Sequence, residues 1–174
     1  MDSNHPSLEG FLFPDTYRFS KDASIKEIVE RMLKRFETKN PDLIKNKDFY
    51  KVLTLASILE EEVLPKDMPT AAGVLWNRLE LDMPLQVDAT LVYKLGRPIE
   101  RTDISSLNSP YNTYRYNGLP PTPISNPGLV SINAALNPQK SNYLYYLSKP
   151  LDKTTIFSET LEEHNLAKAK YLNY

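Results

Sequence analysis

The chain has 174 residues, and 21 Lys and Arg against 22 Asp and Glu give a formal net charge of −1, which offers no support for nucleic-acid binding. Hydrophobic residues make up 41% and charged residues 25%, so the chain can bury a core and is not intrinsically disordered. The absence of Cys excludes disulfides, thiolate metal sites and a Cys nucleophile, and two His residues exclude an all-His metal centre.

The N-terminal part predicts an extended segment followed by a helix. Residues 8–20 are rich in aromatic side chains and are expected to be extended. Ser24 and Glu27 form a capping-box pattern that predicts the start of a helix. Six apolar residues then repeat at helical spacing: Ile25, Ile28, Val29, Met32, Leu33 and Phe36. Asn40-Pro41 is expected to end this helix.

Three further helices are predicted over residues 48–64, 69–81 and 89–95. The second of them carries small residues that allow a close approach to a neighbouring helix: Ala71, Ala72 and Gly73. Asp88 stands at the N-cap position of the third.

Residues 97–127 sustain neither helical nor alternating periodicity. This segment contains Pro98, Pro110, Pro120, Pro121, Pro123 and Pro127. It also carries more large apolar side chains than a simple linker needs, namely Tyr111, Tyr114, Tyr116 and Leu119. We interpret it as an ordered loop that lines a cleft, because long irregular segments in compact domains are usually functional or disordered. A structural wrap over the core is the alternative.

The C-terminal part predicts a helix over 128–136, a hairpin of strands over 143–148 and 154–158, and a last helix. Thr160 and Glu163 form the capping pattern of that last helix. The predicted fold class is therefore α+β: a mainly helical domain with a small antiparallel sheet and a long Pro-rich ordered loop.

Three consecutive glutamates, Glu60 to Glu62, lie in the last turn of the helix predicted over 48–64. At about 100° per residue and with Val52 at zero, the core face of this helix is centred near zero. Glu60 then falls at about 80° beside apolar residues, Glu61 at about 180° opposite the core, and Glu62 at about 280° on the other edge.

Glu60 is the candidate general acid on this pattern. Partial burial, neighbouring like charges and the negative end of the helix dipole would each raise the pKa of a glutamate placed there. A carboxyl group that stays protonated near neutral pH can donate a proton to a leaving group. An acidic but solvated helix end is the alternative.

A series of short motifs runs in order along nearly the whole chain, from Leu8 to Leu172. It comprises Leu8-Glu-Gly-Phe-Leu-Phe-Pro-Asp-Thr-Tyr, Ala56-Ser-Ile-Leu-Glu-Glu-Glu, Asn77-Arg-Leu, Leu85-Gln-Val-Asp-Ala-Thr, Tyr111-Asn-Thr-Tyr, Gly118-Leu-Pro-Pro, Ile124-Ser-Asn-Pro-Gly, Tyr143 to Tyr146 and His164-Asn165. This ordered series resembles the YceG-like family, the endolytic murein transglycosylases.

The resemblance implies a lyase that cleaves the β-1,4 bond between MurNAc and GlcNAc within peptidoglycan strands and leaves 1,6-anhydroMurNAc ends. It places the catalytic glutamate at Glu60, as general acid and then as general base toward the C6 hydroxyl of the same sugar. Glu62 receives a supporting role. No second carboxylate, metal or cofactor is required. A muramidase that uses water, and a glycan-binding or scaffold domain without turnover, remain the alternatives.

Several motif residues are expected to bind the glycan, because amides and hydroxyls suit its polar groups and Tyr rings suit sugar faces. They are Gln86, Asp88, Thr90, Tyr111, Asn112, Thr113 and Tyr114. A plain N-cap is the alternative role for Asp88, and packing onto the core is the alternative for Tyr111 and Tyr114. Ser158 and His164 are weaker supporting candidates, since a lone His near a helix start is more often structural.

Family resemblance also sets expectations about context. Relatives carry an N-terminal membrane helix and a LysM-like region, whereas the longest apolar helical run here, Val52 to Leu59, is far shorter than the ~20 residues that cross a bilayer. We therefore expect residues 1–7 to be a start segment or linker, and residues 8–174 to be a soluble catalytic domain from an anchored, extracytoplasmic protein. Expected partners are peptidoglycan strands and cell-wall synthases of elongation or division. Contact with the membrane is expected only through the absent helix.

Overall fold

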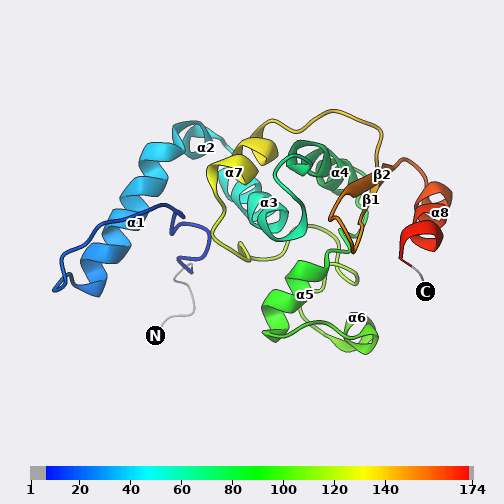
Figure 1. The fold of residues 1–174 in the computed structure, drawn as a ribbon, viewed down its shortest axis with the longest axis horizontal. Coiled ribbons are helices and arrows are strands. Elements are labelled where there is room, and N and C mark those ends of the chain that lie inside the picture. Colours follow the sequence, from blue (N-terminus) through cyan, green and yellow to red (C-terminus); the bar gives the residue numbers. More distant parts are fainter. Residues whose placement is uncertain (1–6, 173–174) are drawn as a thin grey trace.

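The computed structural model describes residues 7–172, so the predicted start segment lies outside the described residues except for Ser7. The helices are α1 (Ile25–Lys39), α2 (Pro41–Lys45), α3 (Phe49–Glu62), α4 (Met68–Glu80), α5 (Asp88–Leu95), α6 (Arg101–Ser106), α7 (Leu129–Leu136) and α8 (Leu161–Tyr171). Strands β1 (Tyr145–Ser148) and β2 (Thr155–Ser158) pair antiparallel, with Tyr145 opposite Ser158. The predicted α+β class, mainly helical with a small antiparallel sheet, is confirmed (Figure 1).

Helix α3 is the centre of the fold (Figure 1). It packs against α7 on one side and against α4, α5 and α2 elsewhere. Every residue from Val52 to Leu59 is buried, including Thr54 and Ser57, which bond to backbone carbonyls of their own helix. A helix that is buried all round is a core helix with no single apolar face. Its polar C-terminal residues are therefore the first ones that reach the surface.

Helix α4 makes a close backbone contact. A Cβ added at Gly73 would lie 2.3 Å from the carbonyl oxygen of Gln139. The Gln139 N–H donates to Pro69 O at 2.9 Å, and the Thr70 hydroxyl donates to Gln139 Oε1 at 2.9 Å. A close approach is therefore present at Gly73, but its partner is the non-helical segment that follows α7 and not a neighbouring helix, as was predicted.

Both predicted capping boxes are present. In α1 the Ser24 hydroxyl accepts from the Glu27 N–H at 3.2 Å, and in α8 the Thr160 hydroxyl accepts from the Glu163 N–H at 3.2 Å. Because each box uses residues within one turn, it can be recognised in sequence without knowledge of the tertiary fold.

Two short helices differ from the prediction. Helix α2 starts at Pro41, where the chain was expected only to leave α1, and α6 interrupts the segment that was predicted to be irregular. They have five and six residues, too few to show an apolar period. Asp103 stabilises the start of α6 by accepting from the Glu100 N–H at 2.7 Å and from Arg97 at 2.8 Å.

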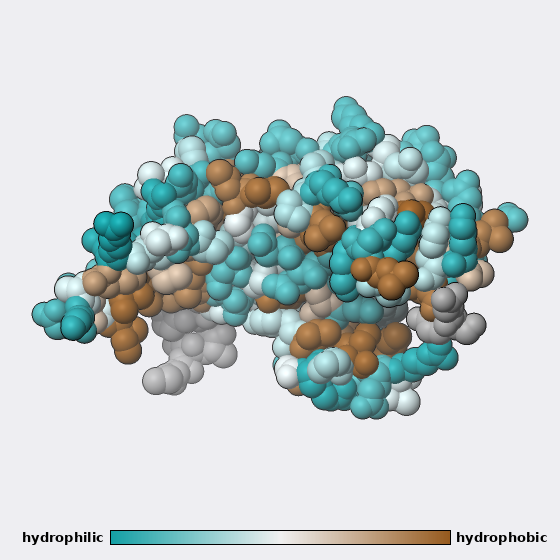
Figure 2. All heavy atoms as spheres, viewed as in Figure 1, coloured by the Kyte–Doolittle hydropathy of each residue, from teal (hydrophilic) through white to brown (hydrophobic). Residues whose placement is uncertain are grey.

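The outer elements surround the core unevenly. Helix α1 extends at one end, α8 lies at the other beside the sheet, and α5 with α6 projects as a lobe from the lower side of the view (Figures 1 and 2). Figure 2 shows apolar residues in small groups among hydrophilic ones on this face. Within residues 7–172, none of the helices combines the length and the apolar character that crossing a bilayer requires.

Candidate active site

A pocket of about 530 Å³ lies where α3 ends and α5 begins, with β1 and α8 on its other side. It brings together five of the sequence candidates, namely Glu62, Gln86, Asp88, Tyr114 and His164. It adds four polar residues that were not predicted as site residues, although the first two lie in the quoted motifs, namely Arg78, Tyr146, Ser148 and Lys168. Glu60 does not line this pocket.

Glu62 is the last residue of α3 and is partly buried. Its Oε1 accepts from the Ala89 N–H at 3.1 Å, and its Oε2 accepts from the Tyr146 hydroxyl at 3.3 Å. Burial raises the pKa of the Glu62 carboxyl above its ordinary value of 4.5, and the nearby Asp88 carboxylate acts in the same direction, while the Ala89 bond opposes them. Glu62 therefore has the environment of a general acid.

Glu60 is exposed and lies on another side of α3. Its Oε2 accepts from the Gly128 N–H at 3.0 Å and from the Ser131 hydroxyl at 2.6 Å, which ties α3 to the first turn of α7. The partial burial predicted for Glu60 is therefore wrong, and the structure shows it at Glu62 instead. The helical angles used in the prediction assumed a helix with one apolar face. Helix α3 is instead buried all round, so the elements packed around its end decide which carboxylate is enclosed.

Asp88 and Tyr114 form a pair beside Glu62. The Tyr114 hydroxyl donates to Asp88 Oδ1 at 2.5 Å. Burial and the Asp88 carboxylate raise the pKa of Tyr114, which keeps its hydroxyl protonated and able to donate. The N-cap of α5 is Val87, and the Asp88 side chain makes no cap bond, so the plain N-cap interpretation of Asp88 is wrong.

Gln86 and Arg78 both line the pocket and are hydrogen-bonded to each other. Gln86 has φ of 55°, and its N–H donates to Thr113 O at 3.0 Å. Its Oε1 accepts from Arg78 Nη1 at 3.2 Å, and Arg78 Nε donates to Leu144 O at 2.6 Å. The sequence offered one signal for Arg78, its place in the Asn77-Arg-Leu motif.

Three predicted glycan contacts are instead buried. Thr90 and Asn112 are 0% exposed and Thr113 is 1% exposed. The hydroxyls of Thr90 and Thr113 lie 3.1 Å apart, and Thr113 Oγ1 accepts from the Val87 N–H at 3.0 Å. Asn112 Nδ2 donates to Ile104 O at 3.0 Å. These side chains position the loop against α5, and burial keeps them out of reach of a substrate, which corrects the expectation.

Tyr111 and Ser158 also have structural surroundings. The Tyr111 hydroxyl bonds to Thr122 Oγ1 at 2.7 Å, and its ring lies 5.4 Å from that of Tyr93. Packing, the alternative, is therefore the role of Tyr111. Ser158 is buried in β2 and does not line the pocket. The Pro-rich segment is ordered and does two things: Tyr111 packs on the body of the protein, and Tyr114 lines the pocket.

His164 lies in the pocket wall on α8. Its ring stacks on that of Tyr145, with the centroids 5.2 Å apart. Burial lowers the pKa of His164, and the positive charges of Lys168 and Arg78 lower it further, so the ring is neutral near pH 7. Its Nδ1 is buried and has no hydrogen-bond partner among the described residues.

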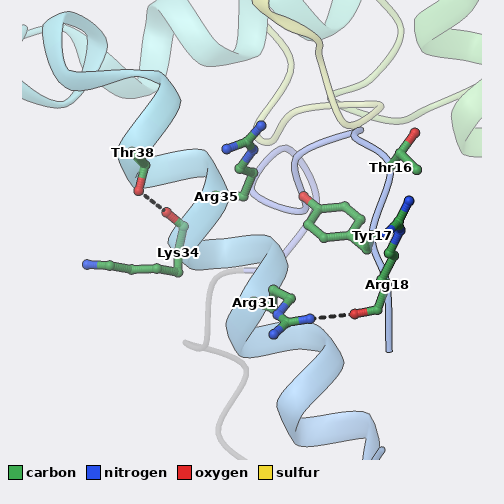
Figure 3. Close-up of a pocket in the computed structure, with 7 residues that line it drawn as sticks. All are labelled: Thr16, Tyr17, Arg18, Arg31, Lys34, Arg35 and Thr38. Atoms are coloured by element: carbon green, nitrogen blue, oxygen red, sulfur yellow. Dashed lines mark hydrogen bonds between the residues drawn. The ribbon is translucent and has the colours of Figure 1, made fainter. Parts of the chain in front are cut away.

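A second cavity, of about 540 Å³, lies between residues 16–18 and α1 (Figure 3). It is lined by Thr16, Tyr17, Arg18, Arg31, Lys34, Arg35 and Thr38. Because none of these residues is a carboxylic acid, this cavity lacks a proton donor of the kind at Glu62. Within residues 7–172, no three His, Asp or Glu side chains converge as metal ligands would. The pocket at Glu62 is the candidate active site.

The raised pKa of Glu62 predicts a pH-dependent stability. Because the folded state binds this proton more tightly than the unfolded state, the stabilisation is complete below about pH 4.5 and is lost as pH rises through the folded-state pKa. Glu62→Gln removes the ionisation but keeps an acceptor for Ala89. We expect the variant to melt at a higher temperature than the parent at neutral pH, with the gain shrinking at acidic pH. Equal melting curves at all pH values would contradict the burial of this carboxyl.

Comparisons with known proteins show which family this chain is similar to. The family model described as "YceG-like family" matches residues 2–170. The chain is 45% identical to an endolytic murein transglycosylase of Bacillus subtilis (strain 168), covering 97% of this chain and 49% of that protein. It is 33% identical to the protein of the same name in Streptococcus pneumoniae (strain R6), covering 95% of this chain and 32% of that protein.

A solved structure has the same fold. A crystal structure of a yceG-like protein from Listeria monocytogenes superposes with a TM-score of 0.85 at 43% identity, covering 92% of this chain and 55% of that one. The chain thus spans about half of the Bacillus relative and about a third of the Streptococcus relative.

Proposed function

This chain belongs to the YceG-like family, and we propose that its residues 8–174 form the catalytic domain of an endolytic lytic transglycosylase acting on peptidoglycan. The names of the relatives support the reaction class. The observation that carries the proposal is the carboxyl of Glu62, partly buried, with a raised pKa, in a polar pocket at a helix end. On this geometry Glu62, and not Glu60, is the general acid.

The proposed reaction is an intramolecular transglycosylation. Protonated Glu62 gives its proton to the glycosidic oxygen as the bond to C1 of MurNAc breaks. The resulting carboxylate is stabilised by the bonds from Ala89 and Tyr146. It then takes the proton of the C6 hydroxyl, whose oxygen bonds to C1 and forms the 1,6-anhydro ring. No water is consumed, and attack within one sugar gains from proximity.

The neighbouring side chains fit this chemistry. The Asp88 carboxylate can stabilise positive charge that develops at C1, as in glycosidases with oxocarbenium-like transition states. Tyr114 orients Asp88, and the Gln86 amide can bond an N-acetyl group. Family membership supports action on the extracytoplasmic face, an anchored parent protein and work beside cell-wall synthases, all as parts of the proposal.

The test is a digest of purified peptidoglycan, with the products separated and weighed by mass spectrometry. We expect anhydro ends, which are one water lighter than hydrolytic ends. Reducing ends would show a muramidase in which water replaces the C6 hydroxyl. Binding to the sacculi without products would favour a glycan-binding or scaffold role. Heat-denatured chain serves as the control for spontaneous breakdown.

A further inference from the structure

The pocket has a basic end as well as an acidic one. Glu62 and Asp88 line it beside α5, whereas Arg78, His164 and Lys168 line it beside β1 and α8. We propose that these three nitrogen-bearing side chains form a subsite for a carboxylate on the lactyl and peptide side of the muramyl residue. This inference rests on the proposed function and names the part of the substrate that the basic end would hold.

Arg78 is the central observation. Its side chain belongs to a residue that is only 6% exposed, and its Nε and Nη1 donate to backbone carbonyls and to Gln86. Nη2 has no hydrogen-bond partner among residues 7–172, and no described carboxylate forms an ion pair with this guanidinium. An enclosed charge without a counter-ion is costly, so its retention at a pocket wall points to an anion supplied by the ligand.

Helix α8 adds two further groups. His164 and Lys168 are four residues apart and therefore share one face of the helix. Lys168 is half-buried and has no ion pair among the described residues, and His164 has an unpartnered buried Nδ1. Arg97, by contrast, has a counter-ion in Asp103 at 2.8 Å. The basic end of the pocket is thus unneutralised by the protein itself.

The chemistry of the substrate supplies the matching anion. N-acetylglucosamine is neutral, whereas each muramyl residue carries a lactyl group that ends in a carboxylate or in a peptide with its own carboxylates. A carboxylate accepts well from a guanidinium and an ammonium group. With the reacting C1 at the acidic end, the substituent of the same sugar can extend toward the basic end. The subsite would then select strands by the charge of this substituent.

The experiment measures binding in a Glu62→Gln background, so that turnover has no part in the result. Soluble glycan strands are prepared in three forms: with acidic peptide stems, with the stem carboxylates amidated, and with the stems removed to leave the lactyl acid. Their affinities are measured by calorimetry for the Glu62→Gln chain and for the same chain that also carries Lys168→Met. Lys170→Met is the matched control, since Lys170 is on the same helix but does not line the pocket.

We expect Lys168→Met to weaken binding of the acidic-stem strands by about tenfold, as loss of a charge-assisted bond would. Binding of the amidated strands should not change. The effect on acidic-stem strands assigns a stem carboxylate, because their lactyl carboxyl is bound in the amide to the stem. A further effect on the stem-free strands shows that the subsite also accepts the free lactyl carboxylate, and its absence there restricts the subsite to stem carboxylates. Equal weakening on all three strands, or an equal effect of Lys170→Met, would overturn the subsite. Because the assay needs no cleavage, its result is separate from failure of the transglycosylase proposal.

Discussion

Replacing Glu62 by Gln is expected to lower kcat by about 10²–10⁴-fold, the usual contribution of a general acid and base. The amide has nearly the same shape, and its oxygen can still accept from the Ala89 N–H. It cannot give a proton to the leaving oxygen or take one from the C6 hydroxyl. The measurement is the rate of appearance of anhydro ends, with glycan affinity followed separately and expected to change by less than about threefold.

Glu60→Gln is the comparison that decides between the two glutamates. Its amide oxygen can still accept from Gly128 or Ser131 at the start of α7, so we expect activity close to that of the parent. Glu162→Gln, on the exposed first turn of α8, controls for loss of one negative charge. If Glu60→Gln abolished turnover and Glu62→Gln did not, the assignment from sequence would stand and the one from the pocket would fall.

Local features of the fold could be predicted from the sequence because each depends on neighbouring residues. The capping boxes at Ser24 and Thr160 fix the starts of α1 and α8 from residues within one turn. The apolar repeat of residues 25–36 could be recognised because it depends only on one face of a helix being turned toward the core. The short helix α6 has no periodic signal, and its start is stabilised by the Glu100 N–H bond to Asp103 and by the ion pair of Asp103 with Arg97.

The choice between Glu60 and Glu62 could not be made from local sequence. Both lie at the edges of the helical wheel, and the distinction comes from residues far along the chain. Ser131 in α7 bonds to Glu60 at 2.6 Å, whereas Ala89 and Tyr146 enclose Glu62. A wheel shows the directions of side chains but not which neighbouring element covers each direction. Tertiary packing therefore determines which carboxyl loses water.

Tertiary packing also decided which of the predicted glycan contacts line the pocket and which are buried. A hydroxyl or amide in a motif can bind a ligand or satisfy buried backbone groups, and both uses need the same residue types. Asn112 and Thr113 were placed by the fold in the second role, with 0% and 1% exposure, whereas Tyr114 next to them lines the pocket. Adjacent residues in a turn point in different directions, so a motif alone does not separate the two roles.

Gly73→Ala is expected to destabilise the fold by about 1–3 kcal/mol, the usual range for overpacking. Helix propensity alone predicts the opposite sign, since Ala replaces Gly in a helix interior with a gain of about 0.5–1 kcal/mol. The clash decides, because the new Cβ would meet the Gln139 carbonyl at 2.3 Å and that segment is fixed by its bond to Pro69. The measurement is urea unfolding: the midpoint concentration should fall, while the slope of the unfolding free energy against urea concentration stays unchanged.

Gly128→Ala is the matched control for this substitution. Its added Cβ meets no atom nearer than 3.7 Å, and its φ of −81° suits any residue. Because glycine is a better N-cap residue than alanine, we expect a loss of about 0.5–1 kcal/mol there, without the added cost of a clash. A Gly73→Ala chain as stable as the parent would show that residues 137–142 can move away from α4. A clearly larger loss of stability at Gly73 than at Gly128 instead locates the effect in the backbone contact with Gln139, which fixes where the chain leaves α7 and runs toward β1 and the pocket.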